Sequence, residues 1–125
     1  MSVLVDSSVW IAYFRGSEKE EVLDSLIEQN LVVINDLILT ELVPSLHVRR
    51  QQRLINLLKE IEKKPVKIDW EDLIRMQIIC INNGINNIGV ADLIIAQHVV
   101  QNNLSLYTLD KHFTLLSRHI PLSIY

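Results

Sequence analysis

The sequence is poor in the residues that mark several protein classes. Its single cysteine, Cys80, excludes a disulfide framework and a zinc site built on cysteine pairs. Only three glycines and three prolines occur among 125 residues, and charged residues make up 22%, so the composition is that of a folded chain. No apolar run approaches the ~18 residues that span a bilayer, so we expect no membrane association. The length suits one domain, and we expect residues 1–125 to form a single domain with one site.

Excess positive charge is also missing. Twelve Lys and Arg residues oppose fifteen Asp and Glu residues, which gives a formal net charge of −3. Bulk electrostatic attraction therefore does not hold nucleic acid, and any such contact must be local or assisted by a metal ion. The N-terminus lacks the basic start and the cleavage site of a signal peptide, and together with the lone cysteine this predicts a cytoplasmic protein.

Short apolar runs alternate with stretches of helical period. Runs of strand character occupy residues 2–5, 31–34 and 104–109, with a weaker one at 65–68. The 3.6-residue period predicts helices at 18–30, 37–43, 51–61, 69–82 and 90–101. This alternation favours an α/β fold of three layers, in which a central, mainly parallel sheet carries helices on both faces. Because 49% of the residues are hydrophobic, we expect strands buried on both faces and an interface with a partner.

Two aspartates follow directly after predicted strands. Asp6 ends the first apolar run, and Asp110 ends the last one. In an open parallel sheet the ligand pocket lies beyond the carboxyl ends of the strands, which is where both residues are expected. The alternative is that each aspartate only caps the helix that follows it.

Asp92 lies on an apolar helical stripe. In the helix predicted for residues 90–101 it shares a face with Ile95, Ala96 and Val99. A buried carboxylate must be hydrogen-bonded, protonated or bound to a cation, because burying an isolated charge is costly. The alternative makes Asp92 the N-cap of a helix that begins one residue later, with Gly89 in the preceding loop.

Glu41 repeats this pattern in the helix predicted for residues 37–43. It shares a face with Leu37 and Ile38. Pro44 is expected to kink or end the helix directly after Glu41 and so to direct its side chain. The alternative is an ordinary, partly exposed helical glutamate.

The four carboxylates come from separate segments that the fold could bring together above the sheet. Like charges at such a site would repel one another, and a hard divalent cation with oxygen ligands relieves that repulsion. Magnesium or manganese suits these ligands best, and no His-Glu-x-x-His spacing favours zinc. A pair of such cations about 4 Å apart binds a phosphodiester and activates water for in-line attack, which is the chemistry of a nuclease.

Several further residues are candidates for the surroundings of this site. Ser8 and Thr108 could hydrogen-bond a carboxylate or a coordinated water, although Ser8 could equally cap the first helix. The basic residues that could contact phosphates at its rim are Arg15, Lys19, Arg49, Arg50, Arg53, Lys111 and His112. Their alternative is ordinary solvent exposure. We expect Trp10 and Trp70 in the core or an interface, and the apolar stripes of residues 18–30 and 51–61 at a dimer face.

Four motifs resemble, in order, the successive motifs of PIN domains, particularly the VapC-type toxin ribonucleases. They are Val5–Ile11, Leu39–Leu42, Val90–Ala96 and Tyr107–Phe113, and the match covers essentially the whole chain. The resemblance implies an α/β/α sandwich around a parallel sheet. It also implies that Asp6, Glu41, Asp92 and Asp110 are the catalytic acids that hold one or two magnesium or manganese ions, with Ser8 in the small hydroxyl position after the first acid.

The resemblance carries expectations about partners as well. It implies hydrolysis of RNA, often transfer or ribosomal RNA, and assembly as a homodimer. It also implies a cognate antitoxin whose C-terminal segment packs along a groove and can place a basic side chain in the acidic pocket. Two other functions stay open: a catalytically silent PIN-like scaffold, and a phosphatase or phospho-acceptor domain. The latter is disfavoured because Asp6 is followed by Ser7 and Ser8 rather than by Asp-x-Asp spacing.

Overall fold

The sheet of the protein is parallel throughout. The computed structural model describes residues 1–16 and 20–125, with only the backbone of Glu20 included. Within them, the sheet has the strand order β3-β2-β1-β4. The strands are β1 (Val3–Val5), β2 (Val32–Ile34), β3 (Glu62–Lys63) and β4 (Ser105–Tyr107). Each neighbouring pair is parallel, with Leu4 opposite Val33 on one side and Leu106 on the other.

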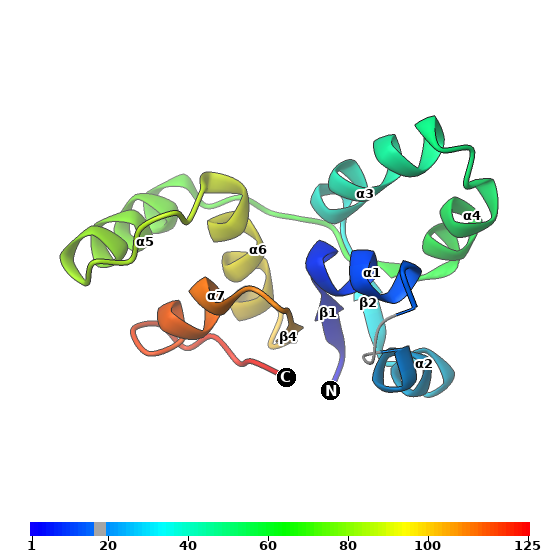
Figure 1. The fold of residues 1–125 in the computed structure, drawn as a ribbon. Coiled ribbons are helices and arrows are strands. Elements are labelled where there is room, and N and C mark those ends of the chain that lie inside the picture. Colours follow the sequence, from blue (N-terminus) through cyan, green and yellow to red (C-terminus); the bar gives the residue numbers. More distant parts are fainter. Residues whose placement is uncertain (17–19) are drawn as a thin grey trace.

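Helices surround this sheet. They are α1 (Ser7–Phe14), α2 (Glu20–Glu28), α3 (Asp36–Val48), α4 (Gln52–Glu60), α5 (Trp70–Asn82), α6 (Val90–Gln101) and α7 (Lys111–Leu116). Figure 1 shows α1 to α4 gathered on the side of β2, and α5 to α7 gathered on the side of β4. The expected three-layer α/β/α fold is confirmed. No helix in the described part of the chain is long and apolar enough to cross a membrane.

The strands β1, β2 and β4 fall where the apolar runs predict them. Every residue of these three strands is buried, as expected for strands covered on both faces. Their side chains join residues such as Val9, Trp10 and Leu93 in one hydrophobic cluster. The prediction for Trp10 is therefore correct, whereas Trp70 lies outside the core with 62% of its surface exposed.

The fourth strand was predicted at the wrong residues. It is β3 at Glu62–Lys63, and the apolar run 65–68 forms a loop. As an edge strand, β3 pairs only with β2 and exposes both of its side chains, so it carries no apolar signal. The ladder ends where Lys64 N donates to Ile34 O at 2.8 Å, and Pro65 has no N–H to continue it.

Helix α3 is longer than the sequence predicted. Asn35 caps its start, but Pro44 does not end it, and the helix continues to Val48. Leu42 and Leu46 on either side of the proline are buried, so packing of the apolar face outweighs the loss of one intrahelical hydrogen bond.

Two buried polar side chains connect the end of β2 to α6. Asn35 Oδ1 accepts a hydrogen bond from Ile38 N, and Asn35 Nδ2 donates to His98 Nδ1, both at 2.8 Å. His98 therefore carries its proton on Nε2, which is buried and has no hydrogen-bond partner among the described residues. Burial lowers the pKa of His98 below its ordinary value of 6.5, so the folded protein holds this imidazole neutral.

This neutral histidine makes stability depend on pH. Below about pH 6.5 the unfolded chain binds a proton at His98, whereas the folded chain does not. The free energy of unfolding therefore decreases as the pH is lowered. One pKa unit of separation corresponds to about 1.4 kcal/mol. We expect His98→Gln, which can still accept from Asn35, to lose this part of the decline between pH 7.5 and 5.5 in urea titrations. Replacing the exposed His119 with glutamine should leave the decline unchanged, and equal slopes for wild type and His98→Gln would contradict the interpretation.

Candidate active site at the carboxyl ends of the strands

Asp6 is the buried acid at the end of β1. Its backbone N–H donates to Tyr107 O at 2.9 Å, which extends the pairing of β1 with β4 by one residue. Asp6 holds the N-cap position of α1, but its side chain makes no capping hydrogen bond. Only 5% of the residue is exposed. The capping alternative therefore does not explain this carboxylate.

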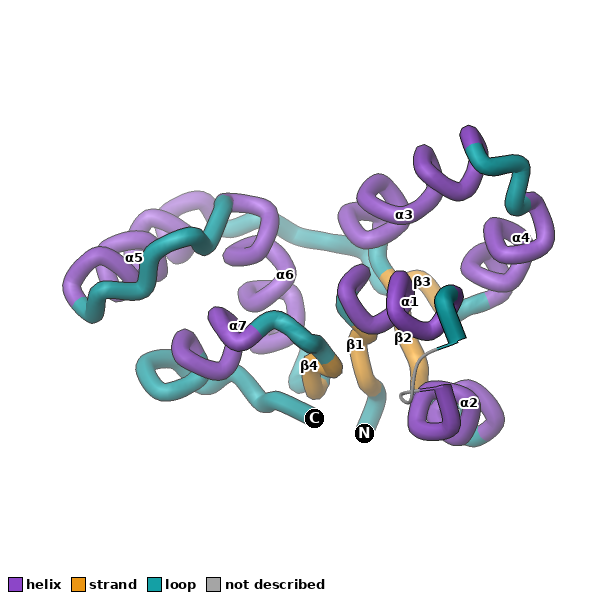
Figure 2. The backbone as a smooth tube through the Cα atoms, viewed as in Figure 1, coloured by secondary structure: helices purple, strands orange, loops and turns teal. Residues whose placement is uncertain are grey.

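Two hydroxyl groups hold the Asp6 carboxylate. Ser8 Oγ and Thr108 Oγ1 each donate to Asp6 Oδ2 at 2.9 Å. Each hydroxyl also accepts a backbone N–H, from Leu109 to Ser8 at 3.1 Å and from Asp110 to Thr108 at 3.0 Å. These bonds tie the β1–α1 junction to the β4–α7 junction, which lie side by side in Figure 2. Among the described residues no hydrogen bond is made to Asp6 Oδ1, which leaves that oxygen for a ligand.

Asp110 combines a capping role with a place beside the other acids. It is the N-cap of α7, and its Oδ1 accepts from His112 N at 2.9 Å. The same oxygen lies 2.7 Å from His112 Nδ1. The capping alternative is thus confirmed for Asp110. It occupies only one of the two carboxylate oxygens, so it does not exclude a further ligand.

Asp92 lies in the first turn of α6 rather than before it. The helix begins at Val90, so the alternative that Asp92 is an N-cap is wrong. Its Oδ2 instead accepts from Gly89 N at 3.3 Å, which orients the side chain. Burial raises the pKa of Asp92, and the nearby carboxylates of Asp110 and Asp6 raise it further.

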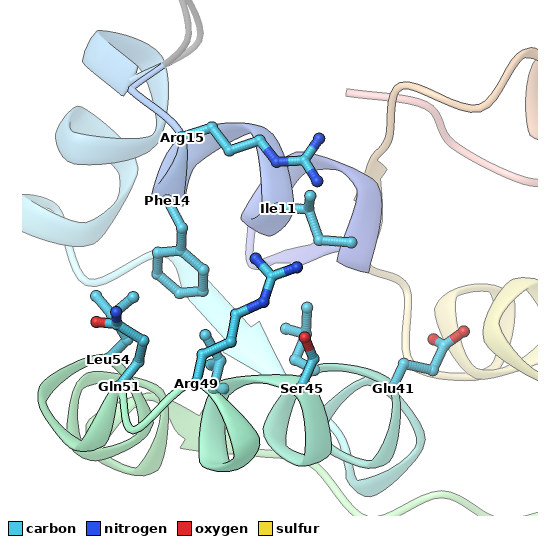
Figure 3. A pocket seen from close by; sticks show the side chains of 10 residues that line it. Ile11, Phe14, Arg15, Glu41, Ser45, Arg49, Gln51 and Leu54 are labelled. Atoms are coloured by element: carbon cyan, nitrogen blue, oxygen red, sulfur yellow. The ribbon is translucent and has the colours of Figure 1, made fainter.

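Glu41 approaches the same region from α3. The residue as a whole is exposed, as one alternative expected, but partial burial of its carboxyl group raises the pKa of Glu41. The charges of Asp6 and Asp92 add to this increase. In Figure 3 its side chain extends away from α1 in the direction of α6, the helix that carries Asp92.

The structure therefore brings the four predicted acids into one electrostatic environment. Asp6 is central, because its charge acts on both Glu41 and Asp92. The side chains are not gathered around a common point: no three Asp, Glu, His or Cys groups in the described ranges are arranged to share one metal ion. The chemistry of the set nevertheless fits magnesium or manganese, because all the available donors are carboxylate or hydroxyl oxygens.

Some of the basic residues predicted to contact phosphates line a pocket, and others are exposed outside it. Arg15 and Arg49 line a pocket that also contains Glu41, as Figure 3 shows. Lys111 and Arg53 are exposed outside that pocket. Lys19 lies outside the residues that the structure describes.

The sequence analysis did not identify Gln97, which fixes the helix that carries Asp92. Gln97 is 2% exposed, and its Nε2 donates to Asp69 O and to Asp72 Oδ2, both at 2.9 Å. Its Oε1 accepts from Asp69 N at 3.1 Å. These bonds attach the start of α5 to the middle of α6. The sequence did contain an indication of this role, because Gln97 is a polar residue that interrupts the apolar face of the predicted helix next to Ala96.

Comparison with known proteins identifies a family that the chain matches and solved structures with a similar fold. Residues 3–118 match the PIN domain family. No curated protein matches the chain. Among solved structures, a chain of the VapBC2 complex from Rickettsia felis, bound to a promoter DNA fragment, superposes with a TM-score of 0.78 at 19% identity, covering 100% of this chain and 98% of that one. A chain of DNA-bound VapBC from Salmonella typhimurium gives a TM-score of 0.76 at 16% identity, with 100% and 97% covered.

A third similar structure is VapC20 from Mycobacterium tuberculosis, described as a toxin that cleaves the sarcin-ricin loop. It has a TM-score of 0.63 at 17% identity, with 91% of this chain and 94% of that one covered. At these identities the structural likeness shows a common fold. The family match spans nearly the whole chain and includes all four acids. The chain therefore belongs to the PIN domain family.

Proposed function

We propose that this protein is an endoribonuclease that depends on magnesium or manganese and acts as the toxin of a toxin–antitoxin pair. The observation that carries the proposal is the buried Asp6 carboxylate, which has one oxygen free of hydrogen bonds from the described residues and lies within electrostatic reach of Glu41 and Asp92. Such mutual repulsion is relieved by a bound cation. Membership of the PIN family, whose members are generally nucleases, supports the same conclusion.

Asp6, Glu41, Asp92 and Asp110 would hold one or two magnesium or manganese ions. A cation bound there supplies neutralisation of phosphate charge and activation of water for in-line attack. The aspartates are oriented by their own neighbours: hydroxyls fix Asp6, a backbone N–H fixes Asp92, and His112 fixes Asp110. Such preorganisation lowers the cost of binding a ligand in one geometry. Glu41 accepts no hydrogen bond from the described residues, which leaves it free to adjust.

The substrate and partners of the proposal follow the similar structures. VapC20 supports RNA as the substrate, and the VapBC complexes support a cognate antitoxin as partner. In our proposal the antitoxin inhibits the enzyme by placing a basic side chain among the acids, where it would take the position of the cation. In our proposal the protein acts in the cytoplasm, where its RNA substrate is found.

The first test of the function is substitution of the central acid. Asp6→Asn keeps the shape of the side chain and an oxygen for the two hydroxyl donors but removes the charge. We expect cleavage of ribosomal and transfer RNA, measured with magnesium or manganese chloride, to fall by more than the about 10–100-fold that loss of a supporting neighbour costs. The stability of the fold should be unchanged or higher, because one of several repelling charges is removed.

The matched control is Asp36→Asn, since Asp36 is an exposed aspartate that pairs with Lys63 rather than with the acids. It should cleave at the wild-type rate. Cleavage by Asp6→Asn at that rate would refute the assignment of Asp6. A wild-type protein that cleaves no RNA with either metal would favour the catalytically silent scaffold.

The second test concerns the cost of keeping the acids together. Because the pKa of Glu41 is raised in the folded protein, ionising it costs the folded state more than the unfolded chain. In EDTA at pH 7 we therefore expect Glu41→Gln to have a melting temperature a few degrees above wild type. As the pH falls toward the ordinary value of 4.5, the wild-type carboxyl takes up a proton and the difference shrinks.

With manganese at pH 7, we expect wild type to melt at a higher temperature than Glu41→Gln. The ion binds the ionised acids and so stabilises wild type more than the variant. The control is Glu21→Gln, which alters an exposed glutamate of α2 and should not raise the melting temperature. A Glu41→Gln protein that melts at or below wild type in EDTA would contradict the proposed electrostatic cost.

We also propose that the protein is a homodimer that uses α5. Of the apolar residues of α2 and α4 that were expected at a dimer face, Leu23 and Leu58 lie in the core, and only Val22 is exposed (40%). The outer face of α5 instead exposes Trp70 (62%), Ile74 (61%) and Ile78 (52%), spaced by four residues, and Ile81 (75%). An apolar stripe of this kind marks an interface rather than an ordinary surface.

Substitution in the middle of this stripe tests the dimer. We expect Ile78→Asp to convert the protein from dimer to monomer in light scattering coupled to size-exclusion chromatography, with the helical circular dichroism unchanged. The fold should tolerate the change because the residue is exposed in the protomer. Val48→Asp, at a 79% exposed residue of α3, is the control and should stay dimeric. A dimeric Ile78→Asp protein, or a monomeric wild type, would exclude α5 as the interface.

A further inference from the structure

A pocket beside the acids lies between α1, α3 and α4. Its volume is about 250 Å³. Figure 3 shows Phe14 and Leu54 toward one end, Glu41 at the other, and Arg15 and Arg49 between them on opposite walls. Glu41 lines the pocket and also lies in the electrostatic field of Asp6 and Asp92, so the pocket is adjacent to the acidic site.

The two arginines of this pocket have no acidic partner among the side chains that the structure describes. Arg15 directly follows α1 and Arg49 directly follows α3, and Figure 3 shows Arg49 reaching up toward α1 and Arg15. With the side chains of residues 1–16 and 21–125, neither guanidinium forms an ion pair or a hydrogen bond. Two permanent positive charges at one cavity, in a chain of net charge −3, form a local site for an anion.

The floor of the pocket is apolar and aromatic. Phe14 is half-buried, and its ring packs against Trp10 at 5.8 Å and Tyr13 at 5.9 Å between centroids. These neighbours hold the ring in one orientation. A fixed aromatic ring next to guanidinium groups can stack a nucleobase while its phosphate contacts the arginines.

We propose that this pocket binds the nucleotide next to the cleaved phosphodiester, with Arg15 and Arg49 on its phosphate and Phe14 against its base. The proposal rests on the function proposed above and names where the single-stranded RNA substrate is held. The Glu41 carboxylate extends away from the arginines toward α6, so it does not oppose a phosphate at their end of the pocket. In this proposal the strand continues past Glu41 toward the aspartates.

An acidic protein segment is the competing occupant. The volume of about 250 Å³ is small for a ligand pocket and suits one base better than a series of peptide side chains. The position of the pocket next to the acidic site also favours the polymer whose phosphates that site would cleave. RNA is therefore the occupant that the charge, the size and the position of the pocket favour together.

The test measures RNA binding without catalysis. The probe is a fluorescein-labelled oligouridylate of about ten nucleotides, titrated with the whole protein in EDTA and followed by anisotropy. We expect Arg15→Gln/Arg49→Gln to weaken binding about tenfold or more. The slope of log affinity against log salt should fall by about 0.7 for each phosphate that the arginines no longer neutralise.

A second variant tests the cavity without changing its charge. Ser45 lines the pocket from the exposed side of α3, so Ser45→Trp should fill it and weaken binding while the fold is retained. The matched charge control is Lys59→Gln/Arg118→Gln, which removes two exposed positive charges outside the pocket. This control should bind within about twofold of wild type, because such distant charges act only through screened interactions.

Failure of this inference is distinguishable from failure of the proposed function. Weakened binding by both pocket variants supports the inference even if the wild type cleaves no RNA. Wild-type affinity in either pocket variant, no measurable binding by wild type, or an equal decrease in the control overturns it even if cleavage by wild type is robust. Unchanged RNA affinity together with weakened affinity for a labelled Leu-Glu-Phe-Asp peptide would assign the pocket to a protein partner instead.

Discussion

The pair of hydroxyl hydrogen bonds onto Asp6 is the interaction on which the site depends. Ser8 comes from the start of α1 and Thr108 from the end of β4, so one carboxylate oxygen joins two segments that are 100 residues apart in the sequence. Because each hydroxyl also accepts a backbone N–H from the β4–α7 loop, that loop is fixed and Asp110 is held beside the first acid. A carboxylate with one oxygen occupied in this way presents the other in a defined direction.

Partial burial of acids that also repel one another is the cost of this arrangement. Burial is the main cause of the raised pKa values of Glu41 and Asp92, and the charges of the neighbouring carboxylates raise them further. A protein tolerates such a site when a ligand later compensates the charge, and perturbed acids are accordingly concentrated at functional sites. The helices that carry these acids are fixed by buried polar contacts, from Asn35 to His98 and from Gln97 to the start of α5. These contacts maintain the spacing that repulsion alone would increase.

The proposed contacts with RNA and with a protein partner lie on different parts of the surface. Its acidic balance leaves no general attraction for nucleic acid, so the positive charge at Arg15 and Arg49 acts locally, next to the acids. Helix α5, which carries the exposed apolar stripe, lies on the other side of the molecule among the helices beside β4 (Figure 1). A partner on α5 and an RNA strand in the pocket could therefore be bound together.

The sequence by itself determined the strands that are buried on both faces and the helix periods, because burial leaves local patterns. It also singled out the four acids as candidates, two because they follow strands and two because they lie on apolar helical faces. It did not reveal β3, since an edge strand with exposed side chains has no apolar run, and it placed the end of α3 at Pro44, where packing of Leu42 and Leu46 decided otherwise. Only the tertiary structure could show that Asp110 is a cap while Asp6 is not. It alone brought Arg15 and Arg49 to one cavity and left α5 uncovered, because these features depend on distances between segments that are far apart in the chain.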